Sequence, residues 1–126
     1  MRPAFIEHVN LTVSDPARSA QLMRDLFGWQ IRWQGPARDG GSVIHVGDDR
    51  VYLAVYAEPG EVKAGLGFDK GAPFNHVGIQ VEDLDEVERR VTAAGLVPFA
   101  HGDYEPGRRF YFLDWDGIEF EIVSYG

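Results

Sequence analysis

The first half of the chain has hydrophobic and polar positions in the order of a strand, a helix and three further strands. Apolar and polar residues alternate over residues 5–13, which is typical of a β-strand with one buried face. An Asp15-Pro16 pair follows, the usual start of a helix, and an apolar stripe at helical spacing then ends at Gly28. Three strand-like stretches separated by Gly, Pro and Asp clusters come next, at residues 30–34, 42–46 and 51–57.

The same order returns after residue 73. Residues 74–81 alternate again, and Asp83 begins a second helix that ends at Gly95. Strands are then predicted at residues 97–100 and 109–113, and we expect His101 to lie in the loop between them. An Asp-Trp-Asp-Gly turn at residues 114–117 leads into a closing strand, the composition of a β-hairpin.

Corresponding features of the two halves are separated by a nearly constant distance along the chain. His8 and His76 are 68 positions apart, and so are the helix-capping residues Asp15 and Asp83. This period predicts an internal duplication and an α+β fold of two tandem βαβββ modules. The predicted boundaries are residues 1–57 for the first module, 58–73 for a Gly- and Pro-rich linker and 74–126 for the second module. One helix covers only one face of each sheet, so the modules should pair, within a chain or across a homodimer.

Composition limits the partners of this chain. Its formal net charge of -8 opposes nucleic-acid phosphates and anionic membrane surfaces, and no apolar run approaches membrane-spanning length. We therefore expect a small-molecule partner, with no nucleic acid and no membrane. The chain has no cysteine, which excludes disulfides and thiolate metal sites and favours a cytoplasmic location.

Two histidines and one glutamate are candidate metal ligands. His8 and His76 occupy the same position in the two modules, and alternation places Glu121 of the closing strand on the corresponding face. The first-module equivalent of Glu121 is Ala54, so three candidate ligands remain. Two neutral imidazoles and one carboxylate can hold a divalent metal and leave positions open for substrate or oxygen. The alternative is that these are polar residues of a solvated sheet face.

Three stretches of the chain resemble one protein family. EHVNLTVSDPARS, NHVGIQVEDLDEV and FYFLDWDGIEFEI are similar to segments of the vicinal oxygen chelate superfamily, which includes glyoxalase I, extradiol dioxygenases, fosfomycin-resistance enzymes and bleomycin-resistance proteins. The resemblance implies an eight-stranded cup built from paired modules. It also implies that His8, His76 and Glu121 bind one divalent ion, Fe(II), Mn(II), Ni(II) or Zn(II).

The resemblance favours one function over others. Ala54 cannot supply the fourth ligand of glyoxalase I, and the remaining set resembles that of extradiol dioxygenases. We therefore expect a divalent-metal-dependent, extradiol-dioxygenase-like enzyme whose small substrate chelates the metal through vicinal oxygens. The alternatives are a glyoxalase I-like lyase or isomerase and a metal-free binding protein of the bleomycin-resistance type. A fosfomycin-resistance activity is disfavoured because no basic residue follows Glu121.

Four further residues are candidates for contact with the substrate. Tyr52 and Tyr56 share a face with Ala54, so they either line the cup or pack across strands. His45 is a candidate acid or base near the metal, or an ordinary strand histidine. Arg109 is a candidate for orienting an anionic substrate, or a solvated arginine at a strand start.

Overall fold

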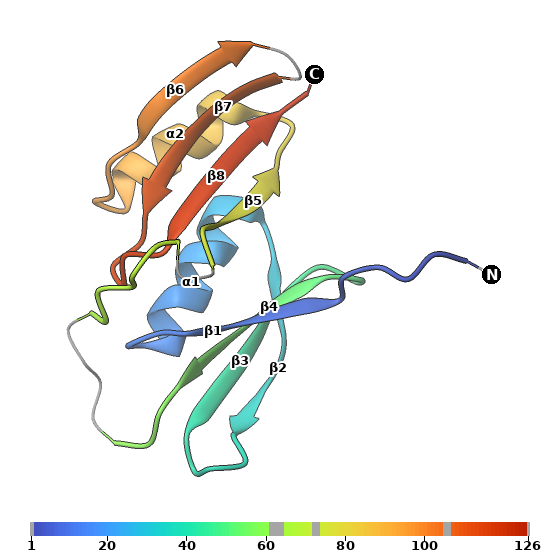
Figure 1. Cartoon of the computed structure of the whole chain (residues 1–126), viewed down its shortest axis with the longest axis vertical. Helices are drawn as coiled ribbons and strands as arrows, with labels where there is room; N and C mark the ends of the chain where they lie inside the picture. The colour runs from blue at the N-terminus through green and yellow to red at the C-terminus, as the bar shows by residue number, and fades with distance from the viewer. Residues whose placement is uncertain (1, 61–64, 72–73, 105–106, 126) are drawn as a thin grey trace. The chain divides into compact units, whose positions relative to one another are not determined.

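The structure is a computed structural model, and it describes residues 2–60, 65–71, 74–104 and 107–125. The chain divides into two compact units, Met1–Lys63 and Ala64–Gly126. Each unit contains four strands and one helix in βαβββ order, as the alternation predicted (Figure 1). The two units are described separately below.

The first unit is a four-stranded mixed sheet with one helix. Its elements are β1 (His8–Thr12), α1 (Pro16–Phe27), β2 (Gln30–Pro36), β3 (Ser42–Gly47) and β4 (Tyr52–Ala57). The strands lie in the order β1-β4-β3-β2, with β1 parallel to β4 and the other neighbours antiparallel. The helix packs on β3 and β4, where Leu22, Met23 and Leu26 are almost fully buried. The opposite face of this sheet has no helix of its own unit.

The second unit repeats this arrangement. Its elements are β5 (His76–Gln80), α2 (Leu84–Ala93), β6 (Phe99–Tyr104), β7 (Gly107–Leu113) and β8 (Glu119–Ser124). The strand order is β5-β8-β7-β6, with β5 parallel to β8. The helix packs on β7 and β8, whose helix-facing side chains Phe110, Phe112 and Phe120 are at most 1 % exposed.

Strand register confirms the duplication residue by residue. The first strand of each unit pairs in parallel with the last strand of that unit, and the pairs are offset by the same period as the sequence. The corresponding pairs are His8–Tyr52 with His76–Glu119, and Asn10–Ala54 with Gly78–Glu121. Ala54 is therefore the first unit's structural counterpart of Glu121, as predicted.

Both helices begin and end where the sequence indicates. Asp15 caps α1 by accepting a hydrogen bond from the backbone N–H of Arg18 at 3.2 Å, and Pro16 is the first helical residue. Gly28 ends this helix with a φ of 71°, a left-handed conformation that favours glycine. In the second unit, Asp83 accepts from the backbone N–H of Glu86 at 3.0 Å.

A hydrogen-bonded turn fixes the register of β8 against β7. Oδ1 of the buried Asp114 accepts from the backbone N–H groups of Asp116 and Ile118, each at 2.9 Å, and Gly117 has a φ of 82°. The segment 65–71 joins this turn, since the backbone N–H of Leu66 donates to Oδ1 of Asp116 at 3.1 Å. The turn therefore sets which side chains of β8 face away from the helix.

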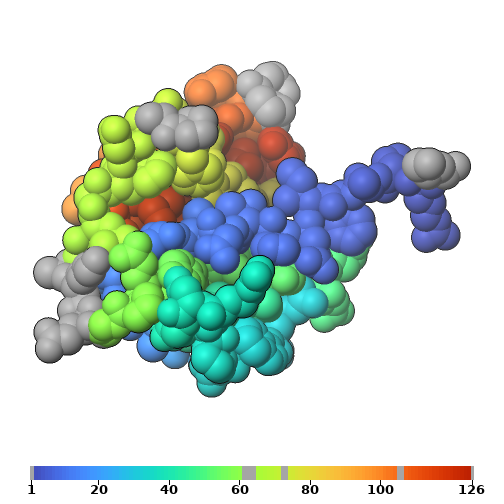
Figure 2. All heavy atoms as spheres, turned by 60° about the horizontal axis from the view of Figure 1, so that its bottom comes forward, coloured from blue at the N-terminus to red at the C-terminus, as the bar shows by residue number. Residues whose placement is uncertain are grey.

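Two sequence predictions differ from the structure at strand ends. A strand was predicted at 97–100 with His101 in a loop, but β6 spans Phe99–Tyr104 and includes His101. A register shift between Phe99 and Gly102 and a positive φ of 54° at Ala100 mark an irregularity that breaks the alternation. At the other end of the chain, β1 begins only at His8, and Phe5 and Ile6 are exposed on a segment that extends beyond the strands (Figure 2).

Candidate functional site

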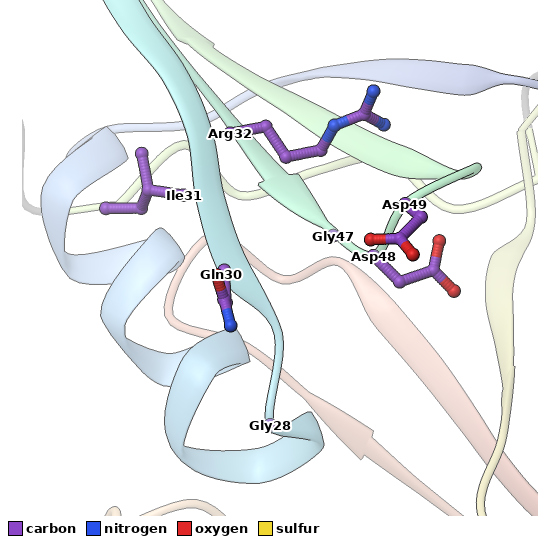
Figure 3. A pocket seen from close by; sticks show the side chains of 7 residues that line it. All are labelled: Gly28, Gln30, Ile31, Arg32, Gly47, Asp48 and Asp49. Atoms are coloured by element: carbon purple, nitrogen blue, oxygen red, sulfur yellow. The ribbon is translucent and has the colours of Figure 1, made fainter.

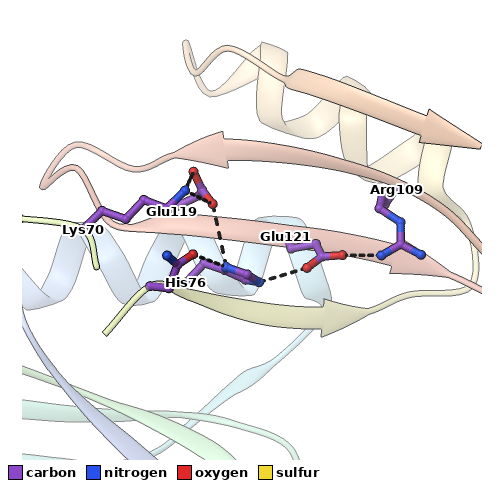
Figure 4. A network of polar contacts seen from close by, with 6 residues as sticks. Lys70, His76, Arg109, Glu119 and Glu121 are labelled. Atoms are coloured by element: carbon purple, nitrogen blue, oxygen red, sulfur yellow. Dashed lines mark hydrogen bonds and ion pairs between the residues drawn. The ribbon is translucent and has the colours of Figure 1, made fainter. Parts of the chain in front are cut away.

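The face of the second sheet that points away from α2 carries most of its ionisable side chains. Alternation buries Phe110, Phe112, Phe120 and Ile122 under the helix and leaves the residues between them on the other face. The polar residues on that face of β7 and β8 are Arg109, Tyr111, Glu119 and Glu121. His76 extends toward them from β5 (Figure 4).

The structure brings two of the three predicted metal ligands together. Nε2 of His76 lies 2.9 Å from Oε1 of Glu121, and the two side chains are 32 % and 15 % exposed. The other ring nitrogen, Nδ1, lies 2.7 Å from Oδ1 of Asn75. A neutral imidazole has one N–H, so an N–H on Nδ1 that donates to Asn75 leaves a lone pair on Nε2 facing the carboxylate. In that tautomer a divalent ion could bind both Nε2 and Oε1, whereas in the other tautomer Nε2–H donates directly to Oε1.

Arg109 holds the second oxygen of the same carboxylate. Its Nη1 donates to Oε2 of Glu121 at 2.8 Å, and its Nη2 donates to the carbonyl of Gly107 at 3.2 Å. The guanidinium lies over the ring of Tyr104, 4.8 Å from the ring centroid, and the side chain is 12 % exposed. Its Nε is buried and has no partner among the described residues. Arg109 is therefore a largely buried cation beside the predicted ligand.

A second buried carboxylate lies on the other side of His76. Glu119 is 6 % exposed and accepts two hydrogen bonds from Nζ of Lys70, at 2.8 and 2.9 Å. Its Oε2 is 3.8 Å from Nδ1 of His76. Sequence reasoning did not identify Glu119 or Lys70 as part of the site. Alternation does place Glu119 on the face of Glu121, but Lys70 belongs to a stretch without any period.

Tyr111 completes this face of the second unit. It pairs with Glu121 across β7 and β8, and its ring meets the ring of His76 edge-on at 5.9 Å. Burial raises the pKa of Tyr111, and the charge of Glu121 raises it further. Its counterpart by register in the first unit is His45, which pairs with Ala54.

The equivalent face of the first unit carries a row of rings in place of ion pairs. The ring of His8 stacks on Tyr52 at 4.9 Å, Tyr52 stacks on His45 at 4.4 Å, and His45 contacts Trp33 at 5.1 Å. The Nδ1 of His8 is 2.9 Å from Oε1 of Glu7, which leaves its Nε2 for another partner. Tyr52, a predicted substrate contact, is only 9 % exposed between the two imidazoles.

His45 and Tyr56, two other predicted contacts, line a pocket of about 730 Å³ in the first unit. Burial lowers the pKa of His45, and the nearby charges of His8 and Arg32 lower it further, so its imidazole is neutral at pH 7. The hydroxyl of Tyr56 donates to Oδ2 of Asp39, and this bond raises the pKa of Tyr56 to about 12. Tyr56 therefore keeps its proton near neutral pH.

A smaller pocket of about 450 Å³ lies at the other end of the first sheet (Figure 3). It is lined by Gly28, Gln30, Ile31, Arg32, Gly47, Asp48 and Asp49. In Figure 3, Arg32 extends toward the side of β2 on which Asp48 and Asp49 lie, and Ile31 points to the opposite side. The carboxylate of Asp48 is already occupied, because its Oδ1 accepts from two backbone N–H groups of its own loop. None of the predicted site residues lines this pocket.

The three predicted ligands are divided between the units. His8 belongs to the first unit, and His76 and Glu121 belong to the second. Within the described part of the chain, no three His, Asp or Glu side chains form a group that could hold a metal ion. The spacing of the two donor atoms in the second unit nevertheless fits a metal ion. Adjacent ligands at ~2.1 Å from an octahedral ion lie about 3.0 Å apart, close to the His76–Glu121 separation.

Among the described helices, none is long and apolar enough to cross a membrane.

One family model matches the chain over residues 5–122. It describes the Glyoxalase/Bleomycin resistance protein/Dioxygenase superfamily. No curated protein matches the chain significantly.

Solved structures share the fold at low sequence identity. A glyoxylase/bleomycin resistance protein/dioxygenase domain from Frankia sp. EAN1pec is 24 % identical with a TM-score of 0.82, and 98 % of each chain is covered. A fosfomycin resistance protein, FosX from Listeria monocytogenes, in complex with Mn(II) and 1S,2S-dihydroxypropylphosphonic acid, is 17 % identical with a TM-score of 0.76, covering 99 % of this chain and 94 % of that one. A glyoxalase I variant from Zea mays is 20 % identical with a TM-score of 0.78, covering 94 % of this chain and 45 % of the maize chain. At these identities the similarity shows the fold alone.

Proposed function

Because the chain belongs to the glyoxalase/bleomycin resistance protein/dioxygenase superfamily, we propose that it is a divalent-metal-dependent enzyme of the extradiol-dioxygenase type. Its substrate is a small molecule that chelates the metal through vicinal oxygens. His8, His76 and Glu121 are the proposed metal ligands, and the three-ligand set leaves positions for the substrate.

The arrangement around His76 is the observation that carries this proposal. Its two ring nitrogens face the oxygens of Asn75 and Glu121 at 2.7 and 2.9 Å, although a neutral imidazole can donate to only one of them. The contact with Asn75 would orient the ring and favour the tautomer with its proton on Nδ1, as a carbonyl or carboxylate commonly does for a metal-bound histidine. His76 and Glu121 would hold a divalent ion through Nε2 and a carboxylate oxygen without a charged imidazole.

The duplication supports His8 as the third ligand. His8 has the same register position as His76, and only its Nδ1 is engaged, by Glu7. The bound ion supplies a Lewis acid that lowers the pKa of substrate hydroxyls. Complexes of the structurally similar FosX contain Mn(II), which supports Mn(II) or the chemically similar Fe(II) as the ion to test first.

Two side chains of this chain have proposed roles toward the substrate. The guanidinium of Arg109 binds one oxygen of Glu121 and orients that carboxylate toward the proposed metal and its substrate. His45 is neutral at pH 7 because its pKa is lowered, so it can accept a proton from a substrate hydroxyl.

The Arg109–Glu121 pair also favours a second candidate function. Glu121 has both oxygens engaged, by His76 and Arg109, so a neutral His76 that donates its Nε2–H to Oε1 would complete a charge-balanced triad that needs no metal. This is the arrangement expected of a metal-free binding protein. Because Arg109 and Lys70 are cations, phosphonic acids should also be tested as substrates. Both lie before Glu121 in the chain; Arg109 was a candidate from the sequence, and Lys70 was not.

Metal content and oxygen consumption separate these candidates. After purification without added metal or chelator, elemental analysis is expected to find Fe or Mn at about one ion per pair of modules. The Fe(II)-loaded protein should then consume oxygen with a catechol. Bound Ni or Zn with turnover of 2-oxoaldehyde adducts and no oxygen uptake indicates a glyoxalase I-like enzyme. No bound metal, and none taken up on addition, contradicts the proposal and favours the binding protein.

We also propose an assembly and a location for the chain. Each sheet has one face without a helix of its own unit, and β1 and β5 are edge strands, so a homodimer that covers these surfaces is proposed. A cytoplasmic location remains a prediction from the absence of cysteine.

A further inference from the structure

The pocket of about 730 Å³ in the first unit is lined by several side chains with unused hydrogen-bonding groups. Four polar side chains line it without a hydrogen bond or ion pair to any described residue: Asn10, Trp33, Arg38 and His45. All four can donate. Their donors are open to solvent, so a ligand with acceptor oxygens can bind them in place of water.

The walls of the same pocket are flat and apolar. Trp33 is 49 % exposed, although its ring contacts the imidazole of His45. Val43, Pro36 and Ala37 provide further apolar surface. An exposed indole beside a second ring is a surface on which a planar ring can stack.

The pocket is lined by one cation, Arg38, and one carboxylate, Asp39. The carboxylate of Asp39 is already used, since Oδ2 accepts from the hydroxyl of Tyr56 and Oδ1 accepts from the backbone N–H of Gly41 at 2.9 Å. Arg38 has no such partner among the described residues. Although the two formal charges cancel, the guanidinium of Arg38 is the group left without a partner, so it can bind the carboxylate of a ligand.

We propose that this pocket binds a planar aromatic acid, with its ring against Trp33 and His45 and its carboxylate at Arg38. The ring row continues from His45 through Tyr52 to His8, so the pocket adjoins one of the proposed metal ligands within the same unit. The statement that the aromatic acid is the substrate rests on the proposed function. The binding itself needs no metal.

Calorimetry on the full-length, metal-free protein tests the inference. The probes are 2-naphthoate, its neutral analogue 2-naphthamide and the non-aromatic cyclohexanecarboxylate. We expect saturable binding of 2-naphthoate and at least about tenfold weaker binding of the other two, because each lacks either the charge or the ring. Trp33→Leu and Arg38→Gln should each weaken 2-naphthoate binding by about tenfold.

Matched variants elsewhere in the unit provide the controls. Arg50→Gln removes an exposed arginine outside the pocket, and Trp29→Phe keeps a ring against Phe27, so both should bind 2-naphthoate as the wild type does. Circular dichroism and urea unfolding confirm that each variant is folded. Equal affinity for acid and amide, or unchanged affinity in both pocket variants, overturns the inference.

Two outcomes separate this inference from the proposed function. Binding of 2-naphthoate by a protein that takes up no metal supports the pocket and contradicts the metal enzyme. Metal uptake without binding of any aromatic acid supports the metal enzyme and contradicts the proposed pocket ligand. If the face is covered by a second copy of the chain, the acids do not bind and Trp33→Leu weakens self-association in sedimentation equilibrium, which also overturns the inference.

Discussion

Ala54 offers a way to add a metal ligand by a single substitution. It is 2 % exposed and pairs with Asn10 as Glu121 pairs with Gly78, so Ala54→Glu puts a carboxylate at the first unit's equivalent of Glu121. If the proposed ion is bound, this carboxylate becomes a fourth protein ligand. If no ion is bound, it is a buried charge without a partner.

The two cases differ in the free energy of unfolding. Without metal, an unpaired buried carboxylate costs about 3 kcal/mol, and the larger side chain in a packed position adds ~1 kcal/mol. The free energy of unfolding should therefore fall by about 4 kcal/mol relative to the wild type. If the fourth ligand tightens Mn(II) binding tenfold, saturating Mn(II) should raise the free energy of unfolding of Ala54→Glu by ~1.4 kcal/mol more than it raises that of the wild type at the same concentration.

Urea unfolding with and without Mn(II) measures both quantities. Ala54→Gln is the matched control, because it adds nearly the same volume without the charge and is a poorer ligand. We expect the stabilisation by Mn(II) to be larger in Ala54→Glu than in either the wild type or Ala54→Gln. An equal increment in all three proteins would refute the equivalence of Ala54 and Glu121 as ligand positions.

Two further predictions concern the turn before β8 and the imidazole in the pocket. Asp114→Ala removes the acceptor of two buried backbone N–H groups and should lower the free energy of unfolding by about 3 kcal/mol, whereas Asp114→Asn keeps one acceptor oxygen and should cost about 1 kcal/mol. Equal losses in urea unfolding would show that these bonds do not hold the turn. The pKa of His45 is lowered from 6.5 in the folded state. The neutral imidazole therefore contributes fully to stability at pH values above 6.5, and this contribution is lost as the pH falls through the folded pKa. His45→Gln should flatten the decline in unfolding free energy between about pH 7 and about pH 5, and an unchanged decline contradicts this reasoning.

Much of the fold could be predicted because local signals and long-range packing agree. Asp15 caps the start of the first helix, and Gly28 ends it in a left-handed conformation. Both effects are local and can be predicted from the residue types. Alternation in the closing strand separated Phe120 from Glu121 correctly. It failed at Ala100, because a positive φ and a register shift within β6 interrupt the two-residue period, and no sequence signal marks that irregularity.

The candidate site could be predicted only in part, from the duplication and from strand alternation. The repeat pairs His76 with His8, and alternation places Glu121 on the corresponding face; the structure brings the donor atoms of His76 and Glu121 within 2.9 Å. Arg109 was a candidate for orienting an anionic substrate, but its bond to Glu121 was not predicted. Lys70 could not be predicted, since it reaches Glu119 from a segment without period and 49 residues away along the chain. Contacts of this kind depend on how the chain folds back on itself, which a local pattern does not encode.

Metal affinity of the three ligand variants tests the central claim most directly. Calorimetric titration of the metal-free protein with Mn(II) should show one site in the wild type and in His101→Ala, a control histidine that is exposed and paired with Glu88. His8→Ala, His76→Ala and Glu121→Ala should each weaken binding by at least about 100-fold, because each removes one of three protein ligands. Unchanged Mn(II) affinity in all three variants, or no binding by the wild type, would contradict the account and leave the histidines and the glutamate as polar residues of two sheet faces.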